Sequence, residues 1–420
     1  MVLSLVASAA ECQPLTFQEA ITKALLSAKA IRISHAEDLR VHRAYFEARD
    51  AYIPQVQLGS GAAYTFGFPI GEPSVFKITS QSLLWNPAQK EYIKAAGYEI
   101  QASDASLDEK RQEVILETAI TYADLDRHLQ ALSLLKREED AANRALDIVA
   151  QRISAGIEPP VEQTRAKLIA ARVRIKRSQV EGDTDLLRLR LAQLTGVPAA
   201  GLETVAGTMP KVPAPIDHED LLKMADATPS VQALKKDSIA KDHTASAEWK
   251  QLRPAVNLVG QYALFSNAIN NYSAYYKSFQ KNNGAFGVEI TVPFLNFSQR
   301  AKAQRTDAEA VKAHAVAEDA RDQIASQIDK LQKSCHQLAD LQEVAELEYQ
   351  LAKSDLETAV ARGETAQGSP KEIQNAQVGE QEKLAAMLDA RFNYQEVRLQ
   401  LMRLTGDLEG WAKSGGSPAP

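Results

Sequence analysis

The side chains that could perform covalent or metal chemistry are few in this sequence, and they are scattered along it. Of the seven histidines, His35 and His42 lie two helical turns apart, and we identify no third ligand to complete a metal site. Cys335 lies beside His336 in a long helical pattern, where a packed or surface thiol is a simpler interpretation than a nucleophile. The sequence contains no HExxH, GxSxG, phosphate-binding or dinucleotide-binding motif. We therefore predict no catalytic residue, no metal site, no cofactor and no enzymatic activity.

The composition is typical of long helices rather than of a compact enzyme. The 420 residues are 45% hydrophobic but only 6% aromatic. A net charge of −6 argues against a nucleic-acid partner, because such proteins usually carry a basic surface. Two cysteines, Cys12 and Cys335, exclude a disulfide framework. No run of about 18 uncharged apolar residues is present, so we predict no transmembrane helix.

Three landmarks recur in the same order in the two halves of the chain. The segment YIPQVQL matches LRPAVNL, LWN matches FLN, and LAQLTG matches LMRLTG. The aligned positions are Pro54 with Pro254, Asn86 with Asn296, and Gly196 with Gly406. The chain is therefore a tandem duplication of about 200 residues per copy.

Each copy is predicted to contain a helix, two strands and a very long helical hairpin. A capping box of Thr16 and Glu19 begins the first helix, which is expected to run to Ala51. The pattern after Asn86 is helical for about 65 residues, which is about 100 Å at 1.5 Å per residue. The predicted first repeat covers 15–200, with a β-hairpin at 55–84 and a helical hairpin at 86–196. The predicted second repeat covers 217–407, with a β-hairpin at 255–295 and a helical hairpin at 297–405. The remaining predicted segments are an export-signal remnant at 1–14, a proline-rich joint at 201–216 and a flexible tail at 408–420. The alternative for 1–14 is a frayed terminus with no targeting role.

The predicted strands alternate between apolar and polar or small residues. Val56 and Leu58 share a face with Tyr64 and Phe66, whereas Gln57 lies on the opposite face. The second copy repeats the alternation, which places Leu258 and Tyr262 on its apolar face. We predict that Tyr64, Phe66, Leu258 and Tyr262 face lipid.

Four strands with one apolar face cannot close a barrel, and their open edges would be costly in lipid. Three chains would supply twelve strands, and symmetric association would close the sheet around a polar lumen. The predicted fold class is therefore mainly α with β-hairpins. It combines tandem-duplicated long antiparallel helical hairpins with four strands per chain, which contribute to a trimeric twelve-stranded membrane β-barrel.

The duplicated pattern resembles the outer-membrane efflux protein family, the TolC-type channel-tunnels of Gram-negative bacteria. The resemblance covers about residues 15–407. It rests on Leu15–Ala20, Tyr52–Val56, Leu83–Pro87, Pro293–Phe297 and the two Leu-Thr-Gly helix ends. It implies a homotrimer in outer-membrane lipid whose helices form an α-barrel in the periplasm. It also implies a passive exit duct of a tripartite efflux or type I secretion system, with a periplasmic adaptor and an inner-membrane transporter as partners.

In this family the helical hairpins end at the periplasmic tip. The resemblance therefore assigns adaptor docking to Gly156 and Ile157 at the first turn, and to Gly363 and Glu364 at the second. It assigns the periplasmic pore constriction to Glu162, Glu372 and Asn375. The second turn is three residues longer than the first, and Asn375 replaces an acid of some members, so an acidic ring is weaker here. The competing interpretation is that both glutamates are solvated carboxylates at helix starts.

Two other protein classes use long helical hairpins. One is a soluble coiled-coil scaffold, which would not require two β-hairpins with this alternation. The other is a periplasmic adaptor, which normally has one helical hairpin and no complete duplication. Both remain as alternatives at this point.

Overall fold

The repeated asparagines begin the two longest helices. The computed structural model describes residues 13–61, 74–215, 220–265, 278, 280–364 and 370–413. Asn86 Oδ1 accepts hydrogen bonds from the backbone N–H groups of Ala88 and Gln89 at 2.9 and 3.2 Å. Asn296 Oδ1 accepts one from the N–H of Gln299 at 2.9 Å. These caps start α3 (Pro87–Ser154) and α8 (Phe297–Glu364), each of 68 residues.

The chain divides into two compact units, and each unit contains segments from both copies of the repeat. The first unit comprises Met1–Ser34, Leu107–Pro229 and Arg321–Pro420, and the second comprises His35–Ser106 and Ser230–Ala320. The duplication is therefore not a division into two separate domains, because each copy contributes to both units. Among the described residues, no helix is both long enough and apolar enough to cross a membrane.

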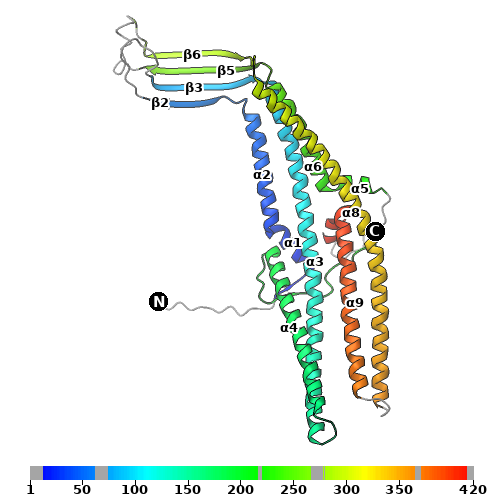
Figure 1. The fold of residues 1–420 in the computed structure, drawn as a ribbon. Helices are drawn as coiled ribbons and strands as arrows, with labels where there is room; N and C mark the ends of the chain where they lie inside the picture. The colour runs from blue at the N-terminus through cyan, green and yellow to red at the C-terminus, as the bar shows by residue number, and fades with distance from the viewer. Residues whose placement is uncertain are drawn as a thin grey trace, which may run out of the picture. The chain divides into compact units, whose positions relative to one another are not determined.

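The second unit contains a four-stranded antiparallel sheet with one β-hairpin from each copy (Figure 1). Its strands in spatial order are β2 (Gln55–Ser60), β3 (Ser74–Trp85), β5 (Ala255–Phe265) and β6 (Asn282–Thr291). The central pair, β3 and β5, joins the two copies and places Thr79 opposite Gln261. The helices of this unit are α2 (Lys29–Asp50) and α6 (Pro229–Lys250) with the first parts of α3 and α8.

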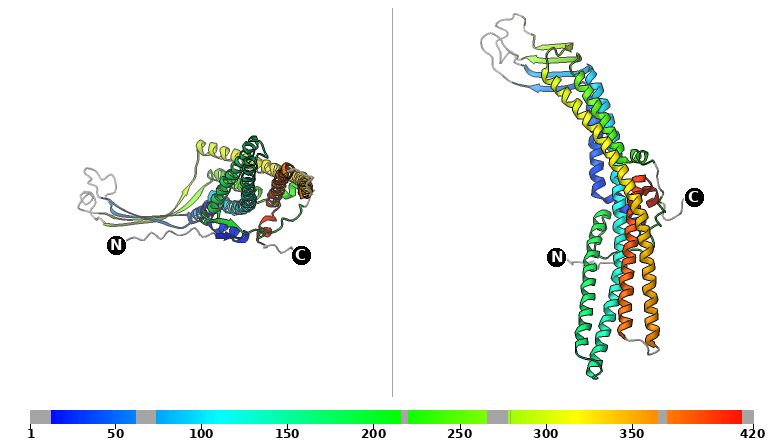
Figure 2. Two further views of the ribbon diagram at one scale, coloured as in Figure 1. Left: turned by 90° about the horizontal axis from the view of Figure 1, so that it is seen from below. Right: turned by 45° about the vertical axis from the view of Figure 1, so that its right-hand side comes forward.

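The first unit contains two antiparallel helical hairpins (Figures 1 and 2). In one, α3 is followed by α4 (Val161–Thr195), and Arg177 pairs with Glu139 across the two helices at 2.7 Å. In the other, α8 is followed by α9 (Pro370–Thr405), and Lys383 pairs with Glu348 at 2.8 Å. The two Leu-Thr-Gly motifs end α4 and α9, because Gly196 and Gly406 adopt φ values of 73° and 88° that favour glycine.

The largest cluster of buried residues in the first unit surrounds Phe17, which is completely buried. Its ring lies 5.5 Å from that of Tyr122 and 5.4 Å from that of Trp411, measured between centroids. Phe17 begins α1 (Phe17–Ser27), whose predicted capping box is confirmed by reciprocal bonds between Thr16 and Glu19. Residues from the start, middle and end of the chain therefore share this core.

The prediction of one helix over 16–51 is wrong, because the chain breaks at Ala28 between α1 and α2. The same break recurs 200 residues later, at Thr228 between α5 (Leu221–Ala227) and α6. There Pro229 accounts for it, since a residue that precedes proline avoids the helical region. No proline follows Ala28, so the first break has no local sequence signal.

Two short elements were also missed. The predicted joint contains β4 (Leu202–Thr204), which pairs in parallel with β1 (Gln13–Leu15). The prediction of a flexible tail at 408–420 is wrong for α10 (Leu408–Lys413), where Leu408, Trp411 and Ala412 are buried. Residues 414–420 lie outside the described residues.

Candidate functional site

The sheet has one apolar face and one polar face, as the alternation of the sequence predicts. The register between strands pairs residues whose side chains lie on the same face, such as Leu58 with Ile78 and Gln57 with Thr79. The apolar face carries Val56, Leu58, Phe76, Ile78, Val256, Leu258, Tyr262, Leu264, Phe286, Val288 and Ile290. Phe286 is 80% exposed and Leu58 69% exposed, so the single chain leaves much of this face uncovered. Exposed apolar surface of this extent indicates contact with lipid or with another protein.

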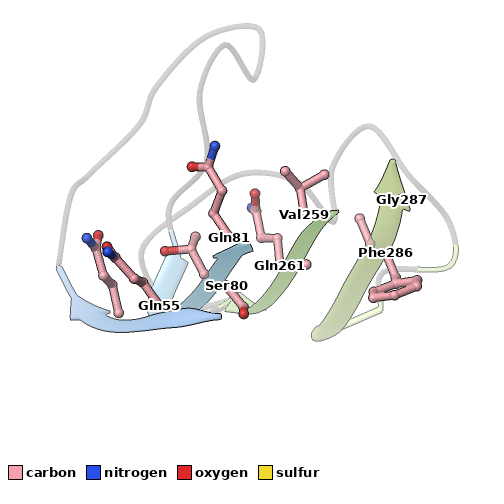
Figure 3. Close-up of a pocket in the computed structure, with 11 residues that line it drawn as sticks. Gln55, Ser80, Gln81, Val259, Gln261, Phe286 and Gly287 are labelled. Atoms are coloured by element: carbon pink, nitrogen blue, oxygen red, sulfur yellow. The ribbon is translucent and has the colours of Figure 1, made fainter. Parts of the chain in front are cut away.

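The polar face is hollowed, and glutamines line the hollow. Figure 3 shows Gln55, Gln81 and Gln261 extending from three neighbouring strands on one side of the sheet, with the Phe286 ring on the other side. Thr79, Val259 and Gly287 also line this hollow, so its surface is mainly small or uncharged polar groups with one larger apolar side chain, Val259, among the glutamines. A face of this kind is suited to contact with water.

The predicted lipid-facing residues can be placed only in the second copy. Leu258 is partly buried on the apolar face, opposite Ser82 and Val288. Tyr262 is 38% exposed on the same face, and its hydroxyl donates to Asn282 Oδ1 at 2.9 Å. Tyr64 and Phe66 lie outside the described residues. The shared face of Leu258 and Tyr262 agrees with the alternation.

The sheet is open at both edges within the described chain. Strands β2 and β6 are the outer strands, and each pairs on one side only. Unpaired strand edges expose backbone N–H and C=O groups, which are costly in an apolar environment. The sheet therefore has an exposed apolar face and two edges whose backbone N–H and C=O groups could pair with another strand.

The turn between α3 and α4 is closed by backbone and side-chain bonds. Gly156 has a φ of 73°, its N–H donates to the carbonyl of Ile153 at 3.0 Å, and the N–H of Ile157 donates to Arg152 at 2.9 Å. This pattern is a Schellman motif. An ion pair of 2.8 Å between Arg152 and Glu158 spans the turn. Ile157 is nevertheless 64% exposed, so the predicted docking residue projects from a well-defined turn.

The second turn is described less completely. The backbone of Gly363 and Glu364 forms the last part of α8, and residues 365–369 lie outside the described residues. The predicted constriction residues lie in the first turns of the returning helices. Glu162 lies in the first turn of α4 and pairs with Arg165 at 2.5 Å. In α9, Glu372 lies in the first turn, and both Glu372 and Asn375 are exposed.

A buried charge network in the second unit was not predicted from the sequence. The Glu91 side chain is only 8% exposed, and it accepts bonds from Lys250, His243 and Lys94 at 2.7, 2.7 and 3.0 Å. Burial raises the pKa of Glu91, but the three hydrogen-bond donors outweigh burial and lower the pKa to about 2. The bonds from Lys250 and His243 link α6 to α3, whereas Lys94 lies on α3 itself, three residues after Glu91. No spacing in the sequence marks the link between the helices, because Lys250 and His243 lie more than 150 positions from Glu91.

A second network surrounds Glu248 on α6, whose side chain is 5% exposed. Its carboxylate accepts bonds from Tyr92 and Gln299 at 2.8 and 2.7 Å and pairs with Lys302 at 2.9 Å. Burial, together with the adjacent Glu248 carboxylate, raises the pKa of Tyr92 to about 12. The hydroxyl of Tyr92 therefore stays protonated and serves as a hydrogen-bond donor. The network ties the two copies together in the second unit.

The outer surfaces of two helices carry apolar residues at helical spacing. On α8 the stripe includes Val344, Leu347 and Leu351, which are 52–66% exposed. On α4 it includes Leu168 and Ile175, one heptad apart, which are 52% and 61% exposed. Such stripes are typical of helices that pack against further helices.

Residues 83–197 match the family model described as "Outer membrane efflux protein". This match confirms the predicted resemblance over these residues, which include the end of β3, α3, the first turn and α4. The chain matches no curated protein sequence.

Solved structures share the fold over nearly the whole chain. A membrane protein from Pseudomonas aeruginosa is 17% identical, with a TM-score of 0.78 and 93% of each chain covered. The outer membrane protein VceC of Vibrio cholerae is 17% identical, with a TM-score of 0.74, covering 93% of this chain and 96% of its own. The CmeC outer membrane channel of Campylobacter jejuni is 13% identical, with a TM-score of 0.78 and coverage of 96% and 90%. The predicted fold class is confirmed.

Proposed function

We propose that this chain, which matches the outer membrane efflux protein family over residues 83–197 and shares the fold of solved outer membrane channels, is one protomer of a homotrimeric channel-tunnel. In this proposal it lies in the outer membrane of a Gram-negative bacterium and extends into the periplasm. It acts as a passive exit duct for efflux or secretion, and it performs no catalysis.

The observation that carries the proposal is the amphipathic sheet. Its apolar face is exposed, and its opposite face is lined by Gln55, Gln57, Gln81 and Gln261. Strands β3, β5 and β6 have 12, 11 and 10 residues, lengths that suit a tilted strand in a bilayer. Lipid would cover the apolar face, and water would fill the space beside the glutamines. A soluble scaffold would leave the apolar face uncovered.

Threefold assembly accounts for the open edges. Strand β6 of one protomer would pair with β2 of the next, and three four-stranded sheets would close a barrel of twelve strands. The exposed stripes on α4 and α8 offer matching contacts between neighbouring helical hairpins. Closure would remove every strand edge from lipid, which supports a trimer rather than a monomer.

The partners of the proposal are a periplasmic adaptor and an inner-membrane transporter. The exposed turn at Gly156 and Ile157 is a suitable docking point, because it ends one long helical hairpin and is held by its own bonds. Gly363 and Glu364 occupy the corresponding end of α8. We propose that Glu162, Glu372 and Asn375 line the pore close to these turns.

The experiment that tests the proposal is membrane fractionation combined with heat-modifiable gel mobility. We expect the full-length chain in the outer-membrane fraction, migrating as a trimer in unheated detergent samples and as a monomer after boiling. A matched variant, Phe286→Asp, places a charge on the most exposed apolar residue of β6 and should reduce recovery of the membrane trimer. Recovery of the unmodified chain in the soluble fraction would favour the scaffold interpretation and overturn the proposal.

A further inference from the structure

Three potential metal ligands converge between α2 and α3 in the second unit. Asp38 and His42 lie one helical turn apart on α2, and Asp104 approaches from α3. One ring nitrogen and one oxygen from each carboxylate all lie within 4.8 Å of one another. His42 Nδ1 is 3.4 Å from Asp38 Oδ1. The sequence analysis found no third ligand for His42, and the fold supplies one from a different helix.

One oxygen of the partly buried Asp38 carboxylate has no hydrogen-bond donor among the described residues, although His42 Nδ1 lies within ion-pair distance of it. The Asp38 side chain is 14% exposed, and this oxygen, Oδ1, is buried. A buried carboxylate oxygen without a donor is costly, because it has lost its hydration. The site is therefore short of positive charge.

Two other histidine–carboxylate pairs in the described chain have a cation beside them, whereas a third, His314 with Asp242, is an exposed pair on the surface. Asp124 and His128 have the same spacing on α3, but Arg127 Nη2 lies 2.6 Å from the Asp124 carboxylate. Glu91 and His243 are accompanied by Lys250 at 2.7 Å. At Asp38 and His42 the third group is a second carboxylate, so the site carries surplus negative charge where the Asp124 and Glu91 pairs are balanced by a side chain.

We propose that Asp38, His42 and Asp104 form a site for a divalent transition-metal ion. One imidazole and two carboxylates suit borderline ions such as Zn²⁺ better than Mg²⁺, which prefers oxygen ligands alone. Zn²⁺ bonds of about 2.0–2.2 Å place neighbouring tetrahedral ligands about 3.4 Å apart, which is the separation of His42 Nδ1 and Asp38 Oδ1. Without a metal, His42 Nδ1 donates to the backbone carbonyl of Asp38 at 3.0 Å, so binding through Nδ1 would replace this hydrogen bond and release its proton. Small side-chain movements would bring Asp104 into the same sphere, and water would occupy a fourth position.

Metal binding at this site would join α2 to α3, because the ligands come from both helices. The site differs from the proposed pore and docking residues, and it does not depend on the proposed function. The test uses the full-length protein in detergent after metal removal with a chelator. Isothermal titration calorimetry with ZnCl₂ measures the number of ions bound, and thermal unfolding measures the stabilisation that binding to the folded state produces.

We expect His42→Ala and Asp104→Asn each to remove one equivalent of bound Zn²⁺ per chain or to weaken its affinity at least tenfold. Excess Mg²⁺ should not displace the ion. The matched control is His35→Ala, which removes an exposed histidine two turns away on α2 and should leave binding unchanged. Zn²⁺ should raise the melting temperature of the unmodified protein and of His35→Ala, but not that of Asp104→Asn. Absence of binding at about 1 mM Zn²⁺, or equal binding by all variants, would overturn the proposal.

Discussion

Single side chains begin and end the helices of this protein, and the sequence reveals them to different degrees. Asn86 and Asn296 were visible as repeated landmarks, and the structure identifies both as helix caps. The sequence places Gly156 at the first turn, and the structure gives it a φ of 73°, which glycine tolerates. Asp104 was missed as a neighbour of His42, because contacts between helices depend on how the helices pack and not on spacing along one of them.

Protonation of Glu91 is expected to make the protein less stable in acid. Its pKa of about 2 lies below the ordinary 4.5, so its contribution to stability is complete above about pH 4.5 and is lost as pH falls toward 2. A difference of this size corresponds to about 3 kcal/mol in the unfolding free energy at neutral pH. Glu91→Gln should lower the melting temperature at pH 7, and the gap from the unmodified protein should narrow below pH 4.5. Exposed Glu47→Gln is the matched control and should change little.

Glu162 and Glu372 are expected to make the proposed channel cation-selective. Threefold symmetry would repeat each carboxylate three times around a narrow end, and such rings favour cations. The Glu162→Gln/Glu372→Gln double variant should therefore shift the reversal potential of single trimers in a planar bilayer toward zero under a salt gradient. Glu343→Gln, an exposed position on α8, is the control. Unchanged selectivity in the double variant would leave both residues as solvated carboxylates at helix starts.

Among the elements, the strands were predictable from alternation, whereas their pairing was not. Val56, Leu58 and Leu258 fall on the predicted apolar face. The sequence does not show that β3 pairs with β5, because that contact joins separate copies through residues about 180 positions apart. Nor does it show the register shift between Leu83 and Trp85. Such features depend on strands that are distant in sequence.

Charge placed on the two faces of the sheet should have unequal effects. Leu258→Arg would place a guanidinium on the apolar face, at a cost of ~2–4 kcal/mol near the middle of a bilayer. Gln57→Arg changes the polar face, where water would solvate the charge, and it serves as the matched variant. We expect Leu258→Arg to reduce the heat-modifiable trimer in outer membranes and Gln57→Arg to retain it. Equal yields of the two variants would reject the assignment of the faces.

The turn between α3 and α4 should be required for export but not for assembly of the trimer. Gly156→Val forces a β-branched residue into a positive φ, which would distort the exposed turn, whereas it changes no residue of the sheet. We expect substrate export to be lost and the trimer to remain. Gly182→Val, an open helical position on α4, is the control.

Crosslinking tests the same turn directly. A cysteine at Ile157 should crosslink to the adaptor, because this side chain is exposed at the tip. A cysteine replacing Lys211 in the joint is the comparison position. Crosslinks from Lys211→Cys alone would place the docking surface elsewhere.

For the whole molecule, the sequence reveals the duplication but not how the copies combine. Matching landmarks at Pro54 and Pro254 predicted two successive repeats, yet each compact unit contains parts of both. The burial of Trp411 was also missed, because a short segment after a helix-ending glycine resembles a tail. Both features depend on contacts between residues that are distant in the chain.

Trp411 is expected to stabilise the first unit substantially. Its side chain is 7% exposed and packs against Phe17, so Trp411→Ala should cost ~3–5 kcal/mol of unfolding free energy. Trp249→Ala, which removes a 36% exposed indole from the second unit, should cost less. Thermal or denaturant unfolding of both variants measures the difference. A smaller loss for Trp411→Ala than for Trp249→Ala would contradict the role of α10 in this core.

The Phe17 core also imposes an order on biosynthesis. Phe17 is made early, yet its backbone N–H bonds to Thr208, 191 residues later, and its ring packs on Trp411. A ribosome adding ~5–20 residues per second needs tens of seconds to supply these partners. The first helix therefore cannot reach its final packing until the chain is nearly complete. During that interval Phe17 and Ile21 remain available to chaperones, and a chain that stops before residue 411 never buries them fully.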